Sequence, residues 1–263
     1  MKKYLDYVVM GIREHVAYPS AIWAKFFSKV VYLYLQFSIW NALFLSNGQM
    51  NAVLKQDDIL NYITVATIIS TFIECNTIEW MNDQIRTGNI VTELIRPVNF
   101  RKMAFLRHLG GTVIKIVFYC IPLSILVGIV LNKPLLCHKQ ILYGLLSVIL
   151  AYCIQFLYSF IIGLLAFWLI VTWPLNMLLG AVYKLLSGAW IPVTMFPDFL
   201  NRINYFFPFR AIYAIPVTIM TNQLNIQNIW QNILIQLIWI IILFAVMELI
   251  WNIGKKKLIV QGG

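Results

Sequence analysis

The chain has 263 residues, of which 61% are hydrophobic and 11% charged, whereas soluble domains carry about 45–50% apolar and about 25% charged residues. Because so few charges cannot cover a soluble surface, this composition excludes a water-soluble globule and predicts an all-α membrane protein. Its 20 Lys and Arg against 10 Asp and Glu give a net charge of +10, which in a membrane chain indicates cationic cytoplasmic loops rather than a nucleic-acid partner.

The N-terminal segment, residues 1–29, mixes large apolar residues with charges and is broken at Pro19-Ser20. This pattern predicts an interfacial helix that lies in the headgroup plane. An ordinary cytosolic lead-in is the alternative. Between Met1 and Met10 there is no apolar run followed by a cleavage site, so the first span is expected to act as the signal.

Six membrane spans are predicted from the uncharged runs, since a helix needs about 20 apolar residues to cross the bilayer. Residues 140–183 carry no formal charge over 44 positions, so two spans share this run and Trp173-Pro174 is the expected break. Turn signals at Ser46-Asn47-Gly48 and Asn132-Lys133-Pro134 close the first and third spans, and Pro122 predicts a kink in the third. The spans are 30–45, 59–78, 109–131, about 141–168, about 174–192 and 229–253, within a transmembrane domain at 30–253.

The orientation follows from the cations outside the spans. Predicted cytoplasmic segments carry 13 Lys and Arg, and predicted outer segments carry 5. This asymmetry places both termini, including the tail at 254–263, in the cytoplasm of a multi-pass cell-membrane protein.

Residues 79–108, between spans two and three, are amphipathic and carry both charge signs. Pro97 ends the first helical portion, since it removes a helical donor. The segment predicts a cytoplasmic helix between two spans, and such a helix can transmit force to a soluble partner. An interfacial connector with a solvated face is the alternative.

Residues 190–221, between spans five and six, hold four prolines among many aromatics. They predict short re-entrant or interfacial helices on the outer side, because broken backbone is tolerated in a membrane only where protein or a water-filled cavity covers it. The functional interpretation is an outer gate, and the alternative is an aromatic belt that anchors the neighbouring spans. The candidate gate residues are Pro192, Phe196, Pro197, Pro208 and Phe209.

Lys184 lies mid-way along predicted span five, with Gly180 and Gly188 one turn away on either side. A charge at this depth predicts a position at a translocation pathway or a dimer seam, while the glycines also suit close helix packing. Three other ionisable residues fall near cytoplasmic span ends and are interpreted as structural: Glu74, Lys115 and Glu248.

No catalytic or metal-binding pattern occurs in the sequence. His15, His108 and His138 fall on different segments, and the four cysteines are widely spaced with no CxxC pair. HExxH, GxSxG and the phosphate loop GxxxxGK[ST] are absent, so neither enzyme chemistry nor ATP binding is expected of this chain.

Two stretches resemble a known family. Residues 85–90 read IRTGNI and residues 93–99 read ELIRPVN, and this resembles the "I-R-x-G-x-I … L-L-R-P-hydrophobic-N" stretch of ABC-2 type exporter permeases. Residues 186–216 contain LSGAWIP, FP, FPF and YAIP, which is similar to the "L-S-G-x-x-I-P … F-P … P-F … Y-x-P" signature of the same family.

The resemblance implies an ATP-driven exporter. Two permease subunits, identical or paired with a sister chain, would form the pathway, and two separate ABC ATPase subunits would hold ATP and Mg²⁺. Residues 82–96 would then be the coupling helix in a groove of the ATPase. Arg86 and Glu93 would make polar contacts, Ile90, Leu94 and Ile95 would pack, and Pro97 would fix the exit angle, with Gly88 and Arg96 completing the motif.

The expected substrate is amphiphilic or hydrophobic, such as a peptide, a drug or a lipid-linked molecule, and leaves the cytoplasm or the inner leaflet. An ion-gradient-driven secondary transporter that needs no ATPase is the alternative. Such a transporter would be expected to contain two repeated halves, and no internal repeat is found in the sequence.

Overall fold

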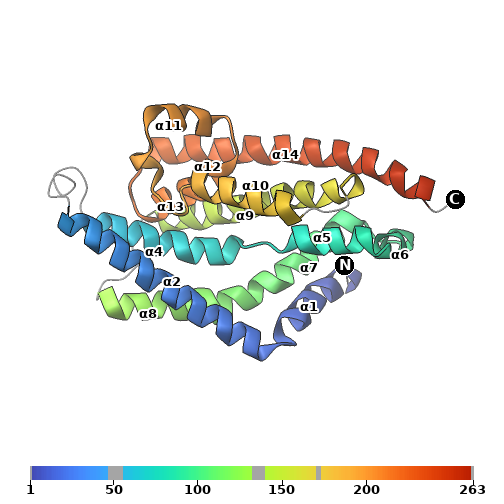
Figure 1. Cartoon of the computed structure of the whole chain (residues 1–263), viewed down its shortest axis with the longest axis horizontal. Helices are drawn as coiled ribbons and strands as arrows, with labels where there is room; N and C mark the ends of the chain where they lie inside the picture. Colours follow the sequence, from blue (N-terminus) through green and yellow to red (C-terminus); the bar gives the residue numbers. More distant parts are fainter. Residues whose placement is uncertain (1, 47–55, 132–139, 170–172, 262–263) are drawn as a thin grey trace.

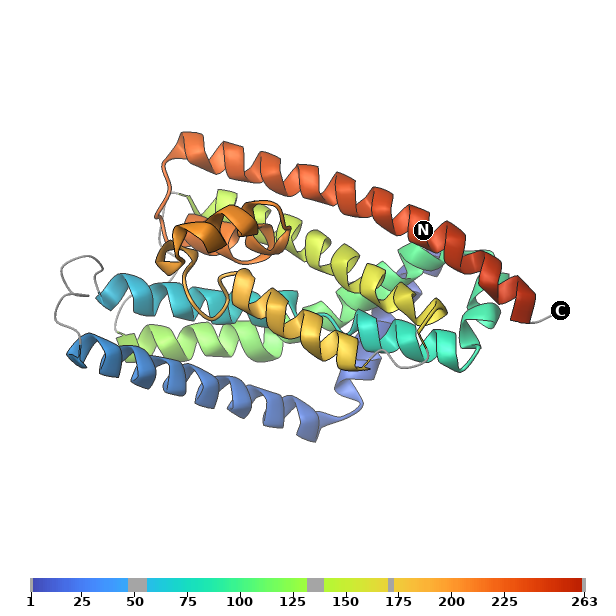
Figure 2. The same cartoon turned by 45° about the horizontal axis from the view of Figure 1, so that its top comes forward.

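The computed structural model describes residues 2–46, 56–131, 140–169 and 173–261, and these residues form helices and connections without a strand. The long helices run side by side, with α14 along one edge of the bundle and α2 along the opposite edge (Figures 1 and 2). The helices are α1 (Lys2–Val16), α2 (Pro19–Ser46), α4 (Gln56–Ile73), α5 (Thr77–Arg86), α6 (Asn89–Ile95), α7 (Phe100–Lys115), η1 (Ile116–Cys120), α8 (Ile121–Leu131), α9 (Ile141–Leu164), η2 (Leu165–Phe167), α10 (Trp173–Leu186), η3 (Val193–Met195), α11 (Asp198–Tyr205), α12 (Phe209–Ile212), α13 (Ala214–Met220) and α14 (Ile226–Gln261).

Four described stretches are long and apolar enough to cross a membrane, and they coincide with predicted spans two, three, four and six. A fifth candidate is the pair α11 and α12–α13, which bends by 81°. Four or five candidates are thus present where the sequence predicts six spans. The four stretches are Gln56–Arg86, Phe100–Ile129, Ile141–Phe167 and Ile226–Lys257.

Predicted spans one and five correspond to helices that fall short of this test. α2 has 28 residues, but Lys25, Lys29, Gln36 and Asn41 dilute its apolar character. α10 has 14 residues, or about 21 Å of helix, and begins at the predicted Trp173-Pro174 break. The predicted range 174–192 is too long, because the chain turns away at Gly188, which has a left-handed φ of 84°.

The N-terminal helix ends earlier than the predicted boundary at residue 29. α1 stops at Val16, and Pro19 starts the long helix α2, since proline suits the first turn of a helix. α1 packs on α7 with their backbones in close approach. A Cβ on Gly11 would lie 1.9 Å from the carbonyl oxygen of Arg107, and one on Gly110 would lie 2.1 Å from that of Val8. Only glycine at these positions allows the two helices to lie so close.

The core surrounds α9, which packs against α4, α5, α13 and α14. Gln236 of α14 joins three elements there. Its amide nitrogen donates to the carbonyl oxygens of Ala211 (2.8 Å) and Ser147 (3.1 Å), and its amide oxygen accepts from the Ser147 hydroxyl (2.9 Å). These bonds satisfy polar groups that the bilayer could not.

The ionisable residues interpreted as structural all have partners. Lys115 donates to the carbonyl oxygen of Glu74, where the chain breaks between α4 and α5, and the Glu74 carboxylate lies 3.4 Å from the Lys29 amino group. Glu248 forms an ion pair with Arg101. Beyond Lys115 the span continues through the π-helix η1, which lies just before Pro122, the position of the predicted kink.

Some predicted features fall outside the described residues. The predicted turn at 132–134 lies wholly outside the described residues, and the turn at 46–48 lies outside them except for Ser46. Cys137 and His138 also lie outside them. The other three cysteines, Cys75, Cys120 and Cys153, are free thiols.

Candidate functional site

The segment predicted to be one coupling helix, residues 82–96, is an elbow of two helices. α5 ends at Arg86, and Gly88 adopts a left-handed φ of 74° before the seven-residue α6 begins. The single-helix prediction is wrong here, because a left-handed residue ends a helix and redirects the chain. Arg96 is extended (φ −65°, ψ 142°), as expected of a residue before proline.

The side chains of α6 divide into a buried and an exposed set. Ile90 is fully buried and packs α6 against the rest of the chain. By contrast, Ile95 is 79% exposed, and Val91 and Leu94 are also exposed. Glu93 forms an ion pair with Arg96 at 3.1 Å. Ile90 is therefore unavailable to another subunit in this conformation, which corrects the predicted packing role of that residue.

The exposed apolar cluster of the elbow consists of Val91, Leu94 and Ile95. The i, i+3, i+4 spacing of its members places them on one helix face. Leu94 and Ile95 were predicted from the sequence motif, whereas Val91 was not, although its spacing from them could have revealed it. Arg86, Gly88 and Pro97, which flank α6 along the chain, are also exposed.

A stack of three aromatic rings joins α5 to two other helices. Trp80 of α5 stacks on Phe100 of α7, with ring centroids 5.7 Å apart and an interplanar angle of 17°. Phe100 stacks in turn on Trp251 of α14, at 5.3 Å and 7°. The sequence gives no signal for this stack, because its members are far apart along the chain. It connects the elbow to the long helices of the bundle.

Arg107 of α7 connects the same region to the N-terminal helix. Its Nε donates to Glu14 Oε2 of α1 at 3.0 Å, and its Nη2 contacts the other carboxylate oxygen. The guanidinium carbon also lies 5.2 Å from the centre of the Trp80 ring, a cation–π geometry. α1, α5 and α7 are thus held together next to the elbow.

The residues of the predicted outer gate lie in the chain of short helices from η3 to α13. Pro197 and Pro208 are the N-cap residues of α11 and α12, where the missing backbone N–H costs no intrahelical hydrogen bond. Pro192, Pro208 and Phe209 are buried, Phe196 is half-buried and Pro197 is exposed. The short helices predicted from the proline pattern are present, and the gate role remains a prediction.

The residues predicted for a pathway or dimer seam do not form one group. Lys184 is exposed on α10, and a Cβ on Gly180 would have no neighbour within 4 Å, so the rest of the described chain leaves these positions uncovered. Gly188 is buried at the corner after α10, where its carbonyl oxygen accepts a hydrogen bond from the Tyr62 hydroxyl at 2.9 Å. Gly188 therefore has a structural role, while Lys184 and Gly180 remain candidates.

Within the described ranges, no group of three or more His, Cys, Asp or Glu residues could hold a metal ion. His108 is instead engaged with the hydroxyl of Tyr152 at 2.8 Å.

The IRTGNI and ELIRPVN motifs lie at this elbow, which joins two long apolar stretches and exposes an apolar cluster. A family model described as ABC-2 family transporter protein matches residues 30–262. The chain belongs to this family. No curated protein sequence matches it. As an ABC-2 permease, it is a multi-pass membrane subunit of an ABC transporter, and members of this family work with ABC ATPase subunits.

Proposed function

We propose that this ABC-2 permease is the membrane subunit of an ATP-driven exporter. Two permease chains, identical or sister, form the pathway, and two separate ATPase subunits bind ATP and Mg²⁺ and hydrolyse the nucleotide. The chain itself catalyses no reaction. The substrate is amphiphilic or hydrophobic and leaves the cytoplasm or the inner leaflet. The observation that carries this proposal is the exposed apolar cluster on α6.

The cluster suits an ATPase groove in both chemistry and position. Three apolar side chains on one face of a short helix can fill an apolar groove. Arg86 and Arg96 are exposed close to them in the chain and would pair with acidic residues at the rim of such a groove. Glu93 is already paired with Arg96, so Arg86 is the stronger candidate for a polar contact across the interface.

If α6 moved, contacts within this chain would transmit the movement to the spans. The buried Ile90 makes α6 move with the residues that enclose it, and the Trp80–Phe100–Trp251 stack links α5 to α7 and α14. The Glu14–Arg107 ion pair extends the linkage to α1. ATP-driven closure of the partner subunits would thereby rock the two permease halves and release substrate outward.

The orientation of the chain fits the same scheme. The start of α1 and the end of α14 lie toward the end of the bundle that holds α6 (Figure 1). If α6 meets a cytoplasmic ATPase, both termini are cytoplasmic, in agreement with the excess of cations on that side.

A pull-down from native membranes tests the proposal. We expect a phosphate-loop ATPase to co-purify with the tagged wild-type chain, and its recovery to fall at least about tenfold in the Arg86→Glu/Ile95→Glu variant. The control, Arg13→Glu/Leu5→Glu, makes the same two changes at exposed positions of α1 and should retain the ATPase. Transport by the chain alone in liposomes, driven by an ion gradient, would instead establish the secondary transporter.

A further inference from the structure

The helix α11, at the end of the bundle opposite α6, has three distinct sides. Asn204 is fully buried, and its amide nitrogen donates to the carbonyl oxygen of Leu186 at 2.7 Å, which fixes α11 to the end of α10. Phe199 and Ile203 form an exposed apolar side, 62% and 44% accessible. The third side is polar, and it carries Asp198, Asn201, Arg202 and Tyr205.

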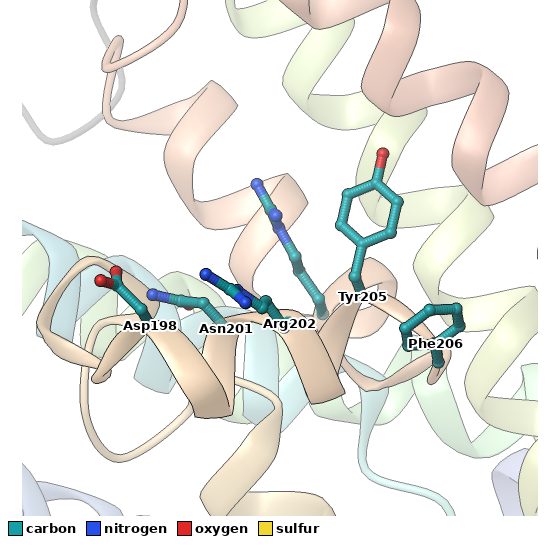
Figure 3. Close-up of a pocket in the computed structure, with 6 residues that line it drawn as sticks. Asp198, Asn201, Arg202, Tyr205 and Phe206 are labelled. Carbon is teal, nitrogen blue, oxygen red and sulfur yellow. The ribbon is translucent and has the colours of Figure 1, made fainter.

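This polar side lines an open hollow of about 760 Å³ (Figure 3). Arg210 of α12 lines the hollow as well. A second hollow of about 260 Å³ shares Asn201 and Arg210 with the first and extends to Tyr62 of α4 and Thr218 of α13. Arg210 therefore stands where an outer basin meets a smaller polar chamber within the bundle.

The two arginines of the basin are not neutralised by the part of the chain that the structure describes. No described carboxylate lies within 4.0 Å of the guanidinium nitrogens of Arg202 or Arg210, and Asp198 forms no ion pair with either of them. By contrast, Arg96, Arg101 and Arg107 all have carboxylate partners. A guanidinium presents its donors in a planar fork that matches a phosphate group.

The surroundings of the basin indicate where the phosphate comes from. The helix α11, which lines the basin, lies at the end of the bundle where the candidate spans α4 and α14 begin (Figure 1). This end is at the depth of lipid headgroups if these helices cross the bilayer. Phe206, 78% exposed, lines it, and Phe199 lies on the adjacent side of the same helix. An amphiphile could thus place its anionic group on the arginines and its chains along the phenylalanines.

We propose that this basin binds the phosphodiester group of a phospholipid, held by Arg202 and Arg210, with the Tyr205 hydroxyl as a further donor. The site lies far from α6 and needs no ATPase contact. The lipid proposal and the coupling proposal can therefore fail separately.

Native mass spectrometry of the purified full-length chain tests the site with three probes: phosphatidylglycerol, diacylglycerol and glycerol phosphate. We expect phosphatidylglycerol to bind at least tenfold more tightly than diacylglycerol, and each Arg→Gln substitution, Arg202→Gln or Arg210→Gln, to weaken its binding about tenfold. The control Arg13→Gln/Lys25→Gln removes two exposed cations elsewhere and should leave the preference unchanged.

Asp198→Asn separates the proposal from a simple loss of folding. Because Asp198 lines the same basin, removing its charge should strengthen the binding of phosphatidylglycerol by a few-fold, which a misfolded variant cannot do. Equal losses in the arginine and control variants would overturn the site. Glycerol phosphate binding as tightly as the lipid would show that a soluble phosphate is the ligand, and would overturn the lipid assignment.

Discussion

Among the described residues, two glycines adopt a left-handed φ, one in the elbow before α6 and one at the corner after α10, and their surroundings differ. Gly88, in the elbow before α6, has φ 74°, and apart from its chain neighbours no atom lies within 4 Å of the place where a Cβ would lie. Gly188, at the corner after α10, has φ 84°, and a Cβ there would lie 2.8 Å from Val193 Cγ2 and 2.9 Å from the Tyr62 hydroxyl. The corner after α10 is packed by its own chain, whereas the elbow is open at Gly88 and exposes apolar side chains beside it.

The strongest test of this contrast is alanine at both glycines. Gly188→Ala adds left-handed strain and overlaps with packed neighbours, so we expect a loss of about 3–5 kcal/mol, or about 10 °C in Tm. Gly88→Ala adds the strain alone, and we expect about 1–2 kcal/mol. Thermal unfolding of the purified chain in detergent measures both. Equal losses in the two variants would show that the corner is no more tightly packed than the elbow.

Within the elbow, the next test separates the side chain that holds α6 from the one that α6 presents. Ile90→Ala removes a fully buried side chain, so we expect a loss of about 2–5 kcal/mol in stability. Ile95→Ala removes an exposed one, and Tm should stay within about 1–2 °C of wild type while ATPase recovery falls. A stable Ile90→Ala chain together with an unstable Ile95→Ala chain would reverse the assignment of buried and exposed faces.

Local sequence patterns predicted the parts of this fold that depend on local chemistry. Uncharged runs located four long apolar stretches, the proline cluster located the short helices between α10 and α14, and Trp173-Pro174 marked the start of α10. The break at Gly88 was missed because the amphipathic pattern continues across it. Glycine can also lie within a helix, so its type alone does not reveal a left-handed φ.

The contacts that make the elbow a site were not predictable from one sequence. Trp80, Phe100 and Trp251 meet only after α5, α7 and α14 have packed, and the Glu14–Arg107 pair joins residues 93 positions apart. Ile90 and Ile95 are also chemically identical in the sequence. Only tertiary packing decides that the first is buried and the second exposed.

A smaller effect is expected at the ion pair that ties α1 to the elbow side of the bundle. Glu14 and Arg107 are partly exposed, so solvent screens them and Glu14→Gln should cost about 1 kcal/mol or less. Arg107→Gln should cost more, because it also removes the contact with Trp80. A double-mutant cycle by thermal unfolding isolates the pair, and additive losses would mean that the two side chains do not interact.

The smallest expected effect concerns pH and the fit of α1 on α7. The His15 ring lies directly over Gly111, its Nδ1 donates to the carbonyl oxygen of Gly11 at 3.1 Å, and burial lowers the pKa of His15 below 6.5. The charges of Lys115 and Lys25 also oppose its protonation, and only Glu14 and the Gly11 carbonyl favour it. His15 therefore binds a proton less readily when α1 is packed on α7 (docked) than when α1 is released from it (undocked).

The sign of the pH dependence follows from this difference. Well above pH 6.5 the imidazole is neutral in both states, and the docking of α1 does not depend on His15 ionisation. As the pH falls below 6.5, the undocked state takes up a proton first and is stabilised, so Tm should decline. His15→Gln should flatten this part of the profile without changing the rest. A Tm that rises between pH 6.5 and 5 in the wild type, but not in the variant, would show that the docked state prefers the charged ring and that the Glu14 carboxylate outweighs burial.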